Sequence, residues 1–86
     1  MEELDKKYKK YLKLTEEAIN KVKVNNKTGE DFLDMAKRYF SDAKHFYEKG
    51  DLITAFAAVV YAHAWLDAGA RIKAFNVKNS RLFMVE

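Results

Sequence analysis

The chain contains no cysteine and no proline, and only three glycines. Without cysteine it can form no disulfide framework, no thiolate zinc site and no cysteine nucleophile. Without proline, the boundaries between its periodic segments are marked by asparagine and glycine instead, at Asn25-Asn26, Gly50 and Asn76. Low-complexity segments and internal repeats are also lacking. These absences exclude several classes of site before any residue is considered individually.

A long apolar segment of the kind that enters membranes is missing as well. The N-terminal stretch MEELDKKYKKYLKL is acidic and then basic, and it lacks the apolar centre of a secretion signal. The longest run without a formal charge is Leu52 to Leu66, which is 15 residues long and shorter than the ~20 that a spanning helix needs. We therefore expect a cytoplasmic protein with no membrane partner.

Length and charge indicate one small domain. The chain has 86 residues and a net charge of +3, with charges of both signs mixed along it. A domain of this size can fold alone with a small core. Lysine outnumbers arginine 13 to 3, whereas bidentate phosphate and base contacts usually come from arginine.

Apolar periodicity predicts three helices, at about residues 2–23, 29–49 and 51–75. Thr28 to Asp31 resembles a capping box at the start of the second helix. Gly50 suits a left-handed C-cap, and Asp51 directly behind it can cap the third helix. A connection this short predicts that the second and third helices form an antiparallel hairpin. The fold class is therefore all-α, an antiparallel up-and-down bundle of three helices within residues 1–76.

The third helix is apolar nearly all the way round, so it must be enclosed by partners. We expect it to be long and mostly buried, with its alanines facing the aromatic residues of the other two helices. Gly69 weakens a helix interior by up to about 1 kcal/mol relative to alanine, which a close helix crossing there would offset. Trp65 is read as a core residue rather than as an anchor for a partner.

The tail, residues 77–86, carries the apolar tetrad Leu82 to Val85, which has no obvious place in the bundle. Two alternatives are open. The tail either docks back onto its own bundle or pairs with another copy to form a homodimer.

One helix face carries His63, Asp67 and Arg71, each four residues from the next. As a tentative binding strip, Arg71 would hold an anion and His63 would exchange a proton while Asp67 orients it. The alternative is a salt-bridge ladder at the exposed edge of a buried helix, and the sequence favours this second interpretation. No catalytic residue is assigned, and the strip has too few ligands for a metal site.

A block of lysines on the first helix offers a second surface. As nucleic-acid contacts they would neutralise phosphates while Tyr8 and Tyr11 stack on bases. Both tyrosines lie on the apolar stripe, however, so a solvated lysine face is favoured. The lysines are Lys6, Lys7, Lys9, Lys10 and Lys13.

Arg38 and His45 match the loose arginine–histidine spacing of the HEPN ribonucleases. The residue after the arginine is Tyr39 rather than the polar residue expected there, and such a spacing arises often by chance. It is a weak argument for nuclease activity.

The run YAHAWLDAGAR (Tyr61 to Arg71), preceded by FYEKGDLITAFAAVVYA, resembles a family of short archaeal proteins known as domain of unknown function 357. The resemblance covers most of the second and third helices. It implies an up-and-down three-helix bundle in a cytoplasmic archaeal protein and implies no activity, cofactor or catalytic residue.

We therefore expect a non-enzymatic module that binds an unidentified protein partner, with a homodimer as one form of it. The alternative function is RNA or DNA binding through the lysines of the first helix. A third hypothesis places weak acid–base chemistry at His63, Asp67 and Arg71. No cofactor is expected.

Overall fold

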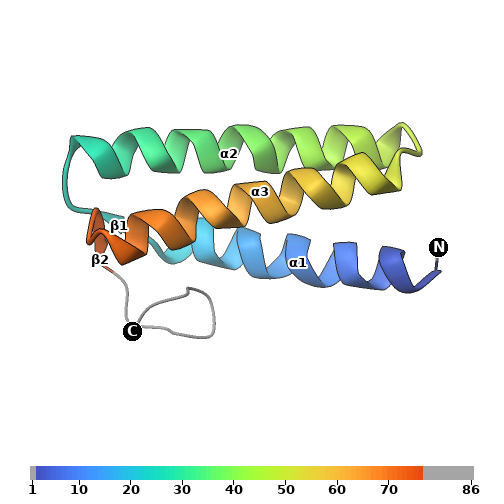
Figure 1. Ribbon diagram of the computed structural model, residues 1–86, viewed down its shortest axis with the longest axis horizontal. Coiled ribbons are helices and arrows are strands. Elements are labelled where there is room, and N and C mark those ends of the chain that lie inside the picture. Colours follow the sequence, from blue (N-terminus) through green and yellow to red (C-terminus); the bar gives the residue numbers. More distant parts are fainter. Residues whose placement is uncertain (1, 77–86) are drawn as a thin grey trace.

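The computed structural model describes residues 2–76, which form a bundle of three antiparallel helices (Figure 1). Helix α1 covers Glu2–Lys21, α2 covers Lys27–Glu48 and α3 covers Leu52–Arg71. Two short strands, β1 at Lys23–Val24 and β2 at Phe75–Asn76, lie beside one another at one end of the bundle. The predicted fold class is confirmed. The predicted tail, residues 77–86, lies outside the described residues.

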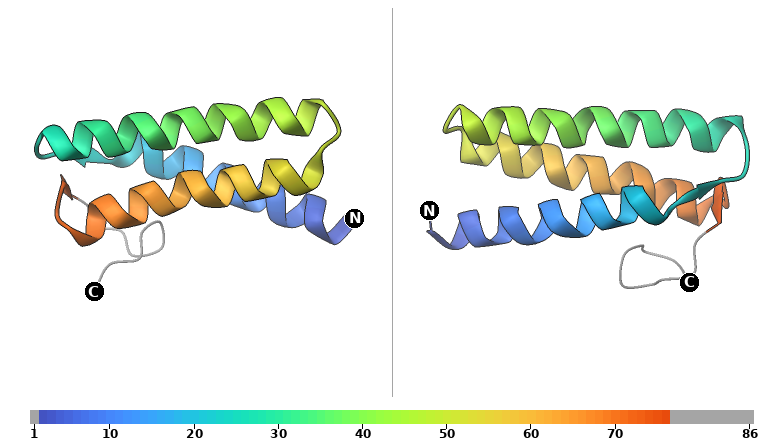
Figure 2. Two further views of the ribbon diagram at one scale, coloured as in Figure 1. Left: turned by 45° about the horizontal axis from the view of Figure 1, so that its top comes forward. Right: turned by 180° about the vertical axis from the view of Figure 1, so that it is seen from behind.

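Helix α3 is the central element. It packs along the whole of α2 and against α1, whereas α1 and α2 contact each other much less. In Figure 1 α3 lies between the other two helices and in front of them, and the view from behind in Figure 2 places it on the far side. Its fully buried residues recur every three or four positions, as one face of a helix requires, and they are Ala55, Val59, Ala62 and Leu66.

The core combines the alanines of α2 and α3 with aromatic residues of α1 and α2, as the composition predicts. Tyr8 of α1 is only 2% exposed, and its ring stacks on that of Tyr47 at a centroid distance of 4.5 Å. The Tyr8 hydroxyl donates a hydrogen bond of 3.3 Å to the carbonyl of Ala43, so its polar end is satisfied inside the bundle. Small residues on α2 thus make room for a large residue on α1.

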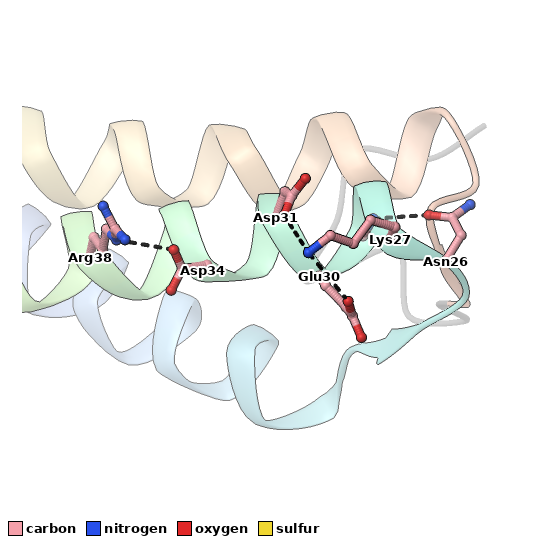
Figure 3. Close-up of polar contacts among 7 residues, drawn as sticks. Asn26, Lys27, Glu30, Asp31, Asp34 and Arg38 are labelled. Carbon is pink, nitrogen blue, oxygen red and sulfur yellow. Dashed lines mark hydrogen bonds and ion pairs between the residues drawn. The ribbon is translucent and has the colours of Figure 1, made fainter.

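Helix α2 begins earlier than the sequence predicts. Asn26, rather than Thr28, is the N-cap, and its Oδ1 accepts a hydrogen bond of 2.9 Å from the backbone N–H of Gly29 (Figure 3). Lys27 then stands in the first turn and forms ion pairs with Glu30 at 3.9 Å and Asp31 at 3.4 Å. The predicted capping box is wrong because asparagine is as good a cap as threonine and stands one turn before Gly29.

The connection between α2 and α3 confirms the predicted hairpin turn. Gly50 has φ of 83°, in the left-handed region that glycine adopts without a steric penalty. Asp51 caps α3 by accepting a hydrogen bond of 3.1 Å from the backbone N–H of Thr54. Hydrogen bonds from the Thr54 side chain, and then from its backbone N–H, lower the pKa of the Asp51 carboxyl because they stabilise the charged form.

Helix α3 ends at Arg71, four residues before the predicted end, because the chain reverses there. Lys73 adopts φ of 61°, and the backbone N–H of Ala74 donates to the carbonyl of Gly69 at 2.8 Å. This is the hydrogen-bond pattern of a Schellman motif with lysine at the left-handed position. The reversal buries Phe75, which is 3% exposed, against Gly69.

The strand pair closes the same end of the bundle and was not predicted. Val24 pairs with Phe75 and Lys23 with Asn76, in antiparallel register. The predicted first helix, which was expected to reach residue 23, therefore ends at Lys21. The short pairing satisfies backbone groups that Phe75 brings to this end when it folds back.

By length and composition α3 is the one described helix that is apolar enough to cross a membrane. The core helix of a folded protein passes the same test, and α3 packs against both other helices. The absence of a membrane partner and the cytoplasmic location both stay predictions.

Candidate functional site

Of the predicted polar strip, His63 and Asp67 lie together on α3, and His63 faces α1. Nε2 of His63 lies 3.6 Å from Oδ1 of Asp67, and the two side chains are 16% and 25% exposed. On its other side, Nδ1 of His63 lies 2.9 Å from the hydroxyl oxygen of Thr15 on α1. Arg71, the last residue of α3, is exposed. Binding of an anion by this strip stays a prediction.

The chain Thr15–His63–Asp67 holds two helices together. In the tautomer with the proton on Nε2, beside the Asp67 carboxylate, Nδ1 accepts the hydrogen bond from the Thr15 hydroxyl. Thr15 is fully buried, so its hydroxyl cannot reach a substrate as a nucleophile. Sequence reasoning missed its role, although a threonine on an otherwise apolar stripe was a usable signal.

A second polar cluster joins the start of α1 to the end of α2. The Tyr47 hydroxyl donates a hydrogen bond of 2.7 Å to Oδ1 of Asp5, and Lys9 pairs with the same carboxylate at 3.0 Å. The Tyr47 hydrogen bond, and then the one from Lys9, hold the pKa of Asp5 below its usual value. In turn, the bond to Asp5 raises the pKa of Tyr47.

The lysine block on α1 is only partly available as a basic surface. Lys9 is paired with Asp5, whereas the other four lysines are exposed and have no ion pair within residues 2–76. Tyr8 is buried, and Tyr11 packs edge-to-face on Phe56 at 5.7 Å. The unpaired lysines are Lys6, Lys7, Lys10 and Lys13. Nucleic-acid binding by this block stays a prediction, without base stacking on Tyr8.

Arg38 and His45 are both exposed on α2 and have separate partners. Arg38 forms an ion pair of 3.0 Å with Asp34, one turn earlier (Figure 3). The His45 ring packs edge-to-face on Phe46. These contacts give each residue a structural role of its own.

An exposed apolar stripe runs along the outer side of α3, away from the buried face. It includes four large side chains, with Ile53 67%, Val60 41%, Tyr61 49% and Ile72 56% exposed. Between them lie exposed alanines. We call this surface the α3 stripe, and it consists of Ile53, Ala57, Val60, Tyr61, Ala64, Ala68 and Ile72. The exposed positions of α3 from Ile53 to Ala68 carry no charge, and the exposed Arg71 lies on the same helix face at its C-terminal end.

Two shallow hollows adjoin the α3 stripe, and Tyr61 lines both. One, of about 330 Å³, lies between α2 and α3 and is lined by Tyr39, Asp42, Phe46, Thr54, Ala57, Ala58 and Tyr61. The other, of about 220 Å³, is lined by Tyr61, Ala64, Trp65 and Ala68. The sequence predicted that α3 is mostly buried, because a lack of charge does not distinguish an enclosed helix face from an uncovered one.

Trp65 is half-buried beside the second hollow. Its ring packs edge-to-face on Phe32 at 5.0 Å and on Tyr61 at 6.3 Å. The indole Nε1 is buried and has no hydrogen-bond partner within the described part of the chain. Trp65 thus joins the core at the edge of the exposed surface. Residues 2–76 contain no group of three or more histidine, cysteine, aspartate or glutamate side chains that could hold a metal ion.

Comparison with known proteins identifies relatives of the same architecture. A family model described as a protein of unknown function, DUF357, matches residues 10–75. The crystal structure of protein AF1782 from Archaeoglobus fulgidus, of that family, is similar with a TM-score of 0.80 and 35% sequence identity. The match covers 90% of this chain and 96% of that one. No curated protein matches the chain.

Proposed function

Because this chain belongs to the DUF357 family of proteins of unknown function, we propose a role from its own surface: a non-enzymatic interaction module that docks a protein partner on the α3 stripe. The carrying observation is that the most apolar helix of the bundle leaves one side uncovered within residues 2–76. Contiguous exposed apolar surface of this kind marks sites of association in small domains.

The shape of the surface favours a helical partner. Ala57, Ala64 and Ala68 project little, so a second helix can approach the backbone of α3 closely. Tyr61 stands between the two hollows and is half exposed, which suits an aromatic anchor at the centre of an interface. A helix laid along a groove with apolar side chains every three or four residues is a recurring mode of recognition.

The other helices present surfaces of a different kind. The outer side of α1 is dominated by lysine, and α2 carries intrahelical ion pairs such as Arg38–Asp34. Exposed pairs of this type are solvated and contribute little to affinity. The contrast between these charged faces and the α3 stripe, whose exposed positions from Ile53 to Ala68 are uncharged, supports the choice of surface.

The test is partner capture by full-length tagged protein that carries one of two matched substitutions. Ala64→Glu puts a charge in the middle of the α3 stripe, and Ser41→Glu puts the same charge on an exposed position of α2. Glutamate is a good helix former, so circular dichroism should show both variants folded. We expect a protein partner that the wild type and Ser41→Glu retain in stoichiometric amount and that Ala64→Glu loses.

Nuclease treatment distinguishes protein binding from the alternative function, which is RNA or DNA binding through α1. We expect the partner to be captured after nuclease treatment as well. A variant with four lysines of α1 changed to glutamate should also retain it, and these are Lys6, Lys7, Lys10 and Lys13. Nucleic acid that elutes with the wild type and is lost with the lysine variant would instead support binding through α1. Equal capture by Ala64→Glu and wild type would refute the α3 stripe as the docking surface.

A further inference from the structure

We propose that the partner on the α3 stripe is a second copy of this chain, with the two α3 helices antiparallel about a two-fold axis. This inference rests on the proposed docking surface and names its occupant. A two-fold interface brings a surface patch against itself, so the patch must be complementary to its own reversed copy. The spacing of the α3 stripe meets that requirement.

Apart from Val60, which falls opposite Trp65, the α3 stripe reads the same from either end. Reversal about a point midway between Ala62 and His63 places Ile53 opposite Ile72, Ala57 opposite Ala68, and Tyr61 opposite Ala64. Each of these residues is exposed in the single chain. The match extends from the first turn of α3 to the residue after its last turn, so the self-complementary surface spans the whole helix.

Side-chain size is complementary in the same register. The two alanine pairs allow the helices to approach to about 8 Å, the lower end of the usual range of separations. Near the axis each Tyr61 ring would meet Ala64 of the other copy, next to the hollow that Ala64 and Ala68 line. The isoleucine pairs would close both ends of the contact. Large side chains therefore meet small ones at the centre, as close packing requires.

Charge favours the antiparallel orientation over the parallel one. In the proposed register Asp51, at the start of α3 in one copy, is level with Lys73, just past the end of α3 in the other. The helix dipoles also oppose each other in this arrangement. A parallel pair would bring Asp51 level with Asp51 and Lys73 level with Lys73, and like charges at close range disfavour association.

The position of α3 leaves room for the second copy. Helix α3 lies in front of α1 and α2 as well as between them (Figure 1), so its outer side can be approached by another bundle. In the described residues the exposed large apolar side chains of α3 all belong to the α3 stripe. Pairing of two stripes would enclose the helix on the side that residues 2–76 leave open.

Single-cysteine cross-linking tests the register, because the native chain has no cysteine. In the proposed dimer the two copies of residue 64 are offset by about 4.5 Å along the helix axes, at 1.5 Å per residue. The two copies of residue 53 are offset by about 28 Å. A short bismaleimide should therefore join Ala64→Cys to itself, should not join Ile53→Cys to itself, and should join Ile53→Cys to Ile72→Cys when the two are mixed.

Sedimentation equilibrium of the full-length protein, from low micromolar to near-millimolar concentration, supplies the second measurement. We expect a dimer whose dissociation constant rises about a hundredfold or more with Ala64→Glu, because a charge would be buried at the interface, and little with Ser41→Glu. Self-linking of Ile53→Cys would overturn the antiparallel register. A monomeric mass at every concentration would overturn the dimer itself.

The tail provides a competing source of association. A full-length variant with Leu82→Ser and Phe83→Ser should remain dimeric with an unchanged cross-linking pattern, and a loss of dimer in this variant would refute the proposal. The proposed docking surface and the proposed dimer are tested by different results. If the wild type is monomeric yet still captures a different protein that Ala64→Glu loses, the docking surface stands and only its occupant was wrong.

Discussion

The hydroxyl oxygen of Thr15 on α1 lies 2.9 Å from Nδ1 of His63 on α3. These residues are 48 positions apart in the sequence, and this bond lies on the side of α3 that α1 covers. Since His63 also faces Asp67, a polar chain crosses from a fully buried hydroxyl to a partly exposed carboxylate. The hydrogen bond between His63 and Thr15 thus helps to position α1 against α3, and anion binding by the predicted strip stays a prediction.

Thr15→Val should lower the free energy of unfolding by about 1–3 kcal/mol, because Nδ1 of the partly buried His63 ring loses its partner while the side-chain shape at residue 15 is kept. Thr15→Ser keeps the hydroxyl and removes only a methyl group, at a cost of about 1 kcal/mol. Urea unfolding of both variants measures the difference. A valine variant as stable as the wild type would show that the hydrogen bond adds nothing.

Asp5 should make stability depend on acid pH. Its pKa is lowered in the folded chain from an ordinary value of 3.8, first by the Tyr47 hydroxyl and then by Lys9. A carboxyl with a lowered folded pKa contributes stability that is present above its unfolded pKa and is lost as pH falls through the folded pKa.

Tyr47→Phe should therefore flatten the loss of stability between about pH 5 and pH 3, because the principal cause of the lowered pKa is removed. Tyr39→Phe is the matched control, since it removes a hydroxyl that has no hydrogen bond in the described residues. Chemical unfolding across this pH range checks both. If the free energy of unfolding depends on pH in the same way for Tyr47→Phe and the wild type, the assigned role of the Tyr47–Asp5 hydrogen bond is contradicted.

The helical part of the fold was accessible from sequence because each signal is local. Apolar residues at three- and four-residue spacing predicted the three helices, and Gly50 followed by Asp51 predicted the hairpin. The boundary at Asn26 was missed because two good caps, Asn26 and Thr28, stand within one turn. Choosing between them depends on where the preceding chain lies, and the β1–β2 pairing sets that position.

The end of α3 and the exposed surface could not be read from sequence. Lys73 occupies a position where glycine is usual, so nothing local marked the chain reversal. The α3 stripe has the composition of a buried face, and only the placement of α1 and α2 shows that it is uncovered. The prediction for Gly69 was half right: it allows a close approach, but the approaching group is the ring of Phe75 rather than another helix.

Gly69→Ala should destabilise the protein by about 1–3 kcal/mol, although alanine is the better helix former by about 1 kcal/mol. A Cβ at this position would overlap the ring of Phe75. In a background of Phe75→Ala the same substitution should be neutral or stabilising, because the space is free. A double-mutant cycle in urea measures the coupling. Equal effects in the two backgrounds would mean that the ring does not restrict residue 69.

Lys73→Gly should stabilise the protein by up to about 1 kcal/mol, because φ of 61° at Lys73 carries a steric penalty that glycine avoids. The hydrogen bond from Asn25 Nδ2 to the Lys73 carbonyl uses the backbone and would be kept. Lys49→Gly is the control, since Lys49 follows α2 with φ of −80° and glycine there only adds freedom to the unfolded chain. Unfolding at low protein concentration, where association contributes little, should move the two variants in opposite directions. A loss of stability in both would mean that the reversal after Arg71 does not impose a left-handed residue.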